Sequence, residues 1–147
     1  MSNWMKALLI SGVCLVLLII AAIGLGAYWF SKHKQELFET ATNARKEGAE
    51  FGRRTDDHGC LAEGLRRHRE HHGFSDAILN NIFLSGCFEA TRPTGDFCEG
   101  VPRSSEMMES IRWRVKKCAD ERLSDSYCGN LFAEVQKYCD SDKARPK

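Results

Sequence analysis

ALLISGVCLVLLIIAAIGLGAYWF, from Ala7 to Phe30, is a run of 24 residues without a charged side chain. As a helix that rises about 1.5 Å per residue, the run reaches about 36 Å, and the hydrocarbon core of a bilayer is about 30 Å thick. The aromatic residues that close it, Tyr28 to Phe30, and Lys32 just beyond are typical of a membrane–water boundary. The run therefore predicts a signal-anchor helix over residues 7–30 that has the lipid bilayer as its partner, preceded by a short cytoplasmic N-terminus, residues 1–6.

The main alternative is a cleaved signal peptide, with small residues near a possible cleavage site at Gly24, Gly26 and Ala27. The apolar run is longer than the usual 7–15 residues of a signal peptide, and large aromatic residues follow these sites directly. A buried helix of a soluble protein would show a polar stripe, which the run lacks. We therefore expect the helix to be retained as an anchor.

Ala22 and Gly26 lie four residues apart in this run, so they share one face of the helix. Small residues at this spacing let a second helix approach closely in lipid. They are candidate contacts for a partner helix or a second copy of the chain. The alternative is composition alone, since glycine and alanine are common in such helices.

Two features of the sequence predict opposite orientations of the helix in the membrane. The positive-inside rule favours a cytoplasmic C-terminal part, because four basic residues follow the run closely (Lys32, Lys34, Arg45 and Lys46). Six of the seven cysteines also follow the run, and such an even set is typical of a disulfide-stabilised domain in an oxidising compartment. We follow the cysteines and expect the N-terminus inside and the domain outside.

The chain beyond the anchor, Ser31 to Lys147, carries 20 basic and 20 acidic residues, so its formal net charge is zero. A nucleic-acid-binding role would need a dominant positive face, and we expect no nucleic acid among the partners.

Helical periodicity predicts an all-α chain, because no stretch alternates with the period of a strand. The expected parts are a juxtamembrane helix within residues 31–54, a disulfide-stabilised bundle of about four helices in residues 55–140 and a polar tail, 141–147. The juxtamembrane helix carries a stripe of mostly small residues that packs on its own domain, a partner or a second copy (Leu37, Ala41, Ala44, Gly48 and Phe51). The expected helices of the bundle cover 58–72, 76–90, 104–122 and 126–139.

Glycine, proline and cap residues place the ends of these helices. In the third helix of the bundle, an apolar face is expected to point inward (Met108, Ile111, Val115 and Cys118).

Six cysteines allow 15 pairings, and the helix outline narrows them. Two antiparallel hairpins would bring Cys60 to Cys87 and Cys118 to Cys128, which leaves Cys98 in a loop to meet Cys139. Each bridge is typically worth about 2–4 kcal/mol. A helical domain this small has a limited core, so the bridges are expected to decide whether it folds.

A histidine-rich segment is the candidate metal site. His68 and His72 lie four residues apart and could bind one metal from one helix face, with His58 or His71 contributing. The alternative is that these histidines are half-buried or solvated near a helix end, where a positive charge is favoured. We expect the structural role, and therefore no metal and no cofactor.

No catalytic motif was recognised in the sequence, including nucleotide-binding loops, C-x-x-C and G-x-S-x-G. Asp56 and Asp57 could form a pair of acids, although capping of the following helix explains them more simply. We therefore expect a protein that is not an enzyme.

The loop 91–103 and Trp113 are the candidate interaction sites of the domain. Phe97 and Val101 lie in a loop expected to be tied by a disulfide, and such a loop can display side chains to a partner. The alternative for Phe97 and for Trp113 is burial in the core.

These observations predict a single-pass protein of a bacterial inner membrane with its C-terminal domain in the periplasm. The expected role is a non-enzymatic accessory, scaffold or assembly subunit that binds another membrane or envelope protein, with a homo-oligomer as a further possibility. Two alternatives remain open: a metal-binding or metal-sensing domain that uses the histidines, and a cleaved, secreted helical effector or inhibitor.

Overall fold

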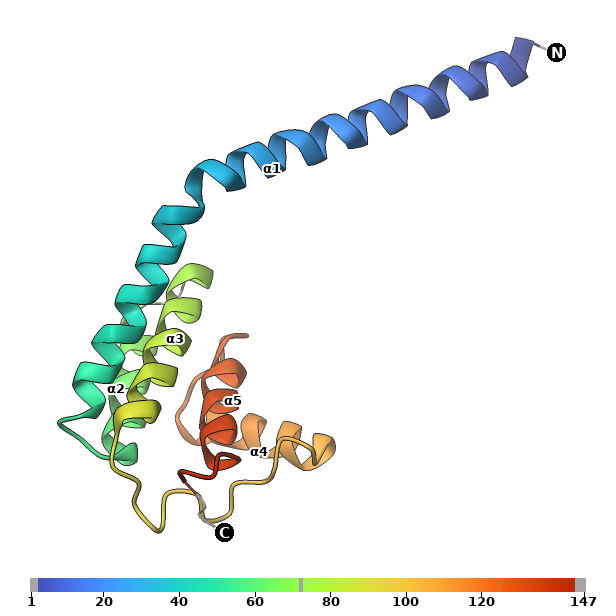
Figure 1. Ribbon diagram of the computed structural model, residues 1–147. Helices are drawn as coiled ribbons and strands as arrows, with labels where there is room; N and C mark the ends of the chain where they lie inside the picture. Colours follow the sequence, from blue (N-terminus) through green and yellow to red (C-terminus); the bar gives the residue numbers. More distant parts are fainter. Residues whose placement is uncertain (1–2, 72, 145–147) are drawn as a thin grey trace. The chain divides into compact units, whose positions relative to one another are not determined.

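The computed structural model describes residues 3–71 and 73–144, and their regular secondary structure is helical (Figure 1). An isolated bridge between Asp56 and Arg92 is the exception. The all-α prediction is thus confirmed for these residues. The helices are α1 (Asn3–Gly52), α2 (Asp57–Glu70), α3 (Phe74–Ala90), α4 (Met107–Asp120) and α5 (Cys128–Cys139).

The chain divides into two compact units, Met1–Glu39 and Thr40–Lys147. In the first unit, Ser11–Lys32 has a mean hydropathy of 2.5 and is long and apolar enough to cross a membrane, a property that signal sequences share. The separate juxtamembrane helix expected within residues 31–54 is not seen, because α1 continues without a break from Asn3 to Gly52. Neither glycine nor proline interrupts the chain between Phe30 and Glu47, so nothing in the sequence ends the helix there.

The last turns of α1 belong to the second unit, where they run alongside α3 (Figure 1). Glycines make this contact close. A Cβ added at Gly48 would lie 2.0 Å from the carbonyl oxygen of Phe83, and one added at Gly86 would lie 2.2 Å from that of Arg45. Only glycine fits where two backbones approach this closely. The end of α1 therefore packs on its own domain, one of the three contacts expected for its stripe of small residues.

The core of the second unit lies between α2, α3 and α5. Phe83, Leu84, Leu131 and Phe132 are fully buried there. At one end of the core the ring of Tyr138 stacks on that of Phe88, with centroids 4.6 Å apart. Large aromatic side chains bury much apolar area per residue, which suits a domain of this size.

Three disulfides join these elements, Cys60–Cys87, Cys98–Cys139 and Cys118–Cys128. They are the pairs expected from the sequence. The first links α2 to α3, the second links the loop before α4 to the end of α5, and the third links α4 to the start of α5. Cys14 in α1 is free and exposed.

Helix α4 turns a different face to the core than the sequence pattern predicted. Trp113 packs edge-on against Phe132 with centroids 5.7 Å apart, and Ser110 is buried, with its hydroxyl accepting a hydrogen bond from Gln136. The expected inward face is wrong for three of its four members, because Met108, Ile111 and Val115 are exposed and Cys118 alone is half-buried. The disulfide at Cys118 and the contact of Trp113 fix the rotation of the helix, and they turn its most apolar face outward.

Candidate functional site

Two of the residues proposed as interaction sites lie in the core. Phe97 and Val101 are each 8 % exposed, and the ring of Phe97 contacts those of Phe88 and Tyr138. The loop 91–103 therefore does not display them to a partner, because the Cys98–Cys139 bridge draws this loop onto the end of α5. Trp113 is half-buried against Phe132, so its large ring serves mainly to pack α4 on α5.

Asp57 has a role that the capping interpretation missed. Asp56 caps α2, because its Oδ1 accepts the backbone N–H of Gly59 at 2.8 Å. Asp57 instead is buried, and it accepts the backbone N–H and the hydroxyl of Thr94 at 2.9 and 2.6 Å. Burial and the nearby Asp57 carboxylate raise the pKa of Tyr138, whose hydroxyl lies 3.4 Å from Asp57. Asp57 thus holds the loop after α3 to the start of α2.

The candidate metal ligands point to different partners. His68 is buried, with Nε2 2.8 Å from Oδ2 of Asp125, whereas Nε2 of the exposed His58 lies 3.2 Å from Oδ2 of Asp96. The other oxygen of Asp125 accepts the backbone N–H groups of Tyr127 and Cys128 at the start of α5. Burial opposes ionisation of Asp125, but its bonds to His68 and the backbone outweigh this and lower the pKa of the carboxyl group.

His68 therefore ties α2 to the start of α5. His71 is exposed, and His72 lies outside the described residues. In the ranges 3–71 and 73–144, no group of three or more His, Cys, Asp or Glu side chains is placed to hold a metal ion.

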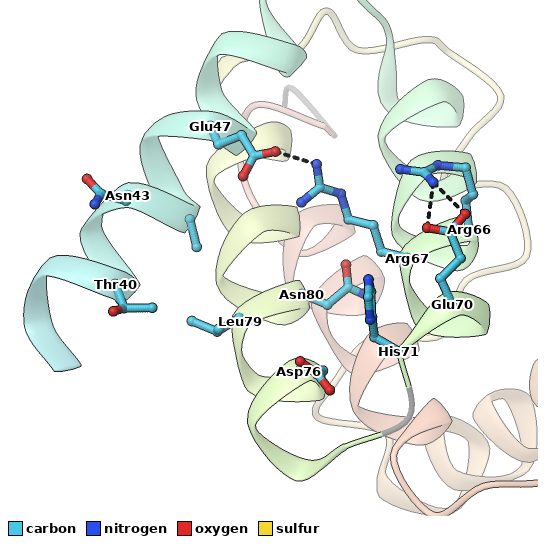
Figure 2. Close-up of a pocket in the computed structure, with 11 residues that line it drawn as sticks. Thr40, Asn43, Glu47, Arg66, Arg67, Glu70, His71, Asp76, Leu79 and Asn80 are labelled. Atoms are coloured by element: carbon cyan, nitrogen blue, oxygen red, sulfur yellow. Dashed lines mark hydrogen bonds and ion pairs between the residues drawn. The ribbon is translucent and has the colours of Figure 1, made fainter. Parts of the chain in front are cut away.

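A polar groove of about 700 Å³ lies between the last turns of α1, the end of α2 and the start of α3 (Figure 2). Its walls carry acidic, basic and amide groups. Figure 2 shows Glu47 of α1 and Arg67 of α2 pointing toward each other across it. The residues that line it are Thr40, Asn43, Ala44, Glu47, Arg66, Arg67, Glu70, His71, Asp76, Leu79 and Asn80.

The charged groups at this groove are bonded to one another. Arg67 donates to Glu47 at 2.5 Å and to Glu63 at 2.8 Å, and its guanidinium lies 3.7 Å from the ring centroid of Phe83. Arg66 donates to Glu63 and to Glu70 at 2.6–2.8 Å. The bonds from Arg66 lead in lowering the pKa of Glu63 to about 2, against the opposing effect of burial. These ion pairs connect α1 to α2.

Replacing Glu63 by glutamine tests this ion-pair network. Because the pKa of Glu63 is lowered in the folded state, its charge stabilises the fold above its ordinary value of 4.5, and this contribution is lost as the pH falls toward about 2. We expect Glu63→Gln to lower the free energy of unfolding by about 1 kcal/mol near neutral pH, after allowance for solvent screening, and by much less in acid. Urea unfolding over a series of pH values measures this difference, and a difference that does not change with pH would contradict the assignment.

Asn80 lies at the floor of the polar groove with one oxygen unsatisfied. Its amide Nδ2 donates to the carbonyl oxygen of Gly64 at 2.8 Å, which fixes the orientation of the side chain. The Oδ1 atom is buried and has no hydrogen-bond partner among the described residues. A buried water is the usual partner of such an atom.

A second candidate surface is the exposed apolar face of α4, called here the α4 stripe: Met107, Met108, Ile111 and Val115. These side chains are between 45 and 71 % exposed. Met108, Ile111 and Val115 are spaced by three and four residues and form one row along the helix, and Met107 lies one turn before Ile111 beside this row. A contiguous group of large apolar side chains on the surface marks an interaction site more often than scattered ones do.

Basic side chains flank the α4 stripe. Helix α4 contains four basic residues and two acidic ones, Glu109 and Asp120. Arg112 and Lys116 lie one turn apart on one edge of the stripe, and their side chains are 72 and 73 % exposed. Each is paired with an acidic residue of the same helix, Arg112 with Glu109 at 3.9 Å and Lys116 with Asp120 at 2.7 Å. On the other edge, Arg114 and Arg122 line a groove of about 720 Å³ that Ile111 and Val115 also line. The face is thus apolar along its centre, with basic side chains along both edges.

A smaller apolar group, the Phe74 patch, consists of Phe74, Ile78 and Tyr127. Phe74 and Ile78 are exposed on successive turns of α3, and the ring of Phe74 lies 6.0 Å from that of Tyr127. Helix α3 turns Phe83, Leu84 and Phe88 to the core and leaves Ile78 exposed.

Ala22 and Gly26 are exposed on α1. A Cβ added at Gly26 would meet no atom within 4 Å, so this face of the helix is open within the chain. Pairing with another helix through this face stays a prediction.

The chain matches no protein-family model, and no match to a curated protein or to a solved structure was found.

Proposed function

We propose that this chain is a single-pass membrane protein that presents its disulfide-stabilised helical domain in the periplasm of a bacterial inner membrane. It acts there as a non-enzymatic accessory or scaffold subunit of another envelope protein. The observation that carries this proposal is the set of three disulfides in a domain that follows an apolar helix.

The disulfides support an oxidising compartment because they are part of the core. Cys60, Cys87 and Cys128 are fully buried, and Cys98 and Cys139 are nearly so. Bridges of this kind persist outside the cytoplasm and are rare within it. The free cysteine, Cys14, lies instead in the apolar segment of α1 that would cross the membrane.

The accessory role is supported by the apolar side chains that the domain leaves uncovered. The Phe74 patch lies at the start of α3, next to the polar groove, which Asp76 and Leu79 of the same helix line. An aromatic anchor beside polar groups is typical of protein–protein contacts. A protein partner would therefore contact this end of the domain.

The location is tested by counting thiols on protein isolated from membranes, alkylated with and without reduction and weighed intact. We expect the full-length mass, one reactive thiol without reduction and seven with it. Seven reactive thiols without reduction would place the domain in a reducing compartment. A mass that corresponds to a chain beginning near Ala27 or Ser31 would show cleavage and favour the secreted effector or inhibitor.

The partner is tested by mild solubilisation of membranes and measurement of the native mass. We expect the chain in a complex of defined composition, and we expect the Phe74→Ser, Ile78→Ser variant to leave this complex while its thermal unfolding is unchanged. Lys137→Ser, an exposed change on α5, is the matched control and should keep the complex. A wild-type chain that is monomeric under all mild conditions would contradict the accessory role.

A further inference from the structure

We propose that α4 docks on an anionic phospholipid surface, with the α4 stripe in the interfacial layer and the flanking basic side chains against the lipid phosphates. This inference rests on the proposed anchoring of the chain in a membrane. It assigns a ligand to a face of the domain that the packing of α4 leaves open.

The amphipathic character of α4 is the first observation that supports docking on a lipid surface. Its inward side is occupied by Trp113, buried Ser110 and the bridge at Cys118, so the exposed side is free of contacts within the domain core. Helices that lie in a membrane interface have an apolar face a few ångströms deep and lysine or arginine beside it. Methionine, isoleucine and valine form that face here, and Arg112 and Lys116 lie beside it.

The net positive charge of α4 is the second observation, and it favours an anionic lipid. The whole chain beyond the anchor has equal numbers of acidic and basic residues, yet α4 has twice as many basic residues as acidic ones. Basic residues near an anionic leaflet each contribute about 1 kcal/mol to binding. The groove beside the stripe adds Arg114 and Arg122 next to the apolar side chains of Ile111 and Val115. Asp125 also lines this groove, but its carboxylate is bonded to His68, so the two arginines remain for a phosphate joined to an acyl chain.

The size of the stripe favours a lipid surface over a protein partner. Met107 to Val115 spans about 12 Å along the helix, and four side chains are few for a stable protein interface, which buries about 800 Å² on each partner. A lipid contact needs less, because an anchored domain is held at high local concentration beside the bilayer. A weak second contact is then enough to populate the docked state.

The test uses the full chain in nanodiscs of phosphatidylcholine, either pure or with roughly one-third phosphatidylglycerol. An environment-sensitive fluorescent amino acid replaces Val115, and in a matched protein it replaces Lys137 on α5. We expect blue-shifted emission and quenching by brominated lipids at position 115 when phosphatidylglycerol is present. The probe at position 137 should report water in both nanodiscs.

The variant R112Q, K116Q removes two charges without touching the core. We expect it to lower the ratio of docked to undocked domains roughly 30-fold, and raised salt should act in the same direction. A probe at position 115 that reports water in both nanodiscs would overturn the proposal. So would shielding that occurs in native membranes but not in protein-free nanodiscs, which would point to a protein on this face.

Failure of the anchoring itself has a different signature. A chain without a membrane anchor would not enter the nanodiscs at all, and its intact mass would reveal cleavage. Failure of lipid docking leaves the chain in the nanodisc with position 115 exposed to water.

Discussion

Replacement of Cys60 and Cys87 together by alanine should lower the free energy of unfolding of the oxidised protein by about 3–5 kcal/mol. The bridge joins α2 to α3 across 27 residues, so its loss frees the unfolded chain, and both sulfur atoms are fully buried, so it also leaves a cavity. For a domain of this size we expect the melting temperature, measured by near-UV circular dichroism, to fall by roughly 15 °C or more.

The Cys118–Cys128 bridge provides the control. It spans only 10 residues, and Cys118 is half-buried, so its removal by the same double replacement should cost less, about 2–3 kcal/mol. An equal or larger loss at Cys118–Cys128 would show that loop length and burial do not govern the stability of this domain.

Addition of a single methyl group at Gly48 should lower the free energy of unfolding by about 2–4 kcal/mol, even though alanine is the better helix former. The new Cβ would lie 2.0 Å from the carbonyl oxygen and 2.9 Å from the carbonyl carbon of Phe83. Neither atom belongs to a flexible side chain, so the last turns of α1 must move away from α3. Chemical unfolding of Gly48→Ala with all disulfides intact measures the loss.

Gly129 is the matched position for this test, because it lies in α5 and an added Cβ would meet nothing within 4 Å. We expect Gly129→Ala to leave stability unchanged or to raise it by up to about 1 kcal/mol. If Gly48→Ala were as stable as Gly129→Ala, the close approach of α1 and α3 would be wrong.

The helical architecture could be predicted from the sequence because its signals are local. Alternating breakers and caps, such as Asp56 before α2, place helix ends to within a few residues. The pairing of the cysteines followed, because two helices joined by a short turn must be antiparallel, and this brings Cys60 near Cys87.

The orientation of α4 could not be predicted in this way. An apolar pattern on a helix indicates the inward face only when nothing else fixes the rotation, and here the Cys118–Cys128 bridge and Trp113 do so. Ser110, on the polar side of α4, is buried and accepts a hydrogen bond from Gln136 of α5. These two residues lie 26 positions apart in the sequence, so a local pattern does not reveal their contact. Long-range contacts also decide which apolar side chains are exposed. The sequence pattern predicted partner contacts at Phe97 and Val101, which are buried, whereas Ile111 and Val115 are exposed.

The joining of α1 to the domain has a consequence for release of the domain from its anchor. The compact unit begins at Thr40, and Gly48 and Gly52 of α1 contact α3 within it. A protease that cuts between Ser31 and Glu39 would therefore shed a complete domain, with its core and bridges intact. A cut near Thr55, where the bundle of shorter helices begins, would instead remove the turns of α1 that pack on α3, together with Phe51, which packs against the core. For this chain, the position of a cut decides whether the shed domain keeps the packing of α1 on α3.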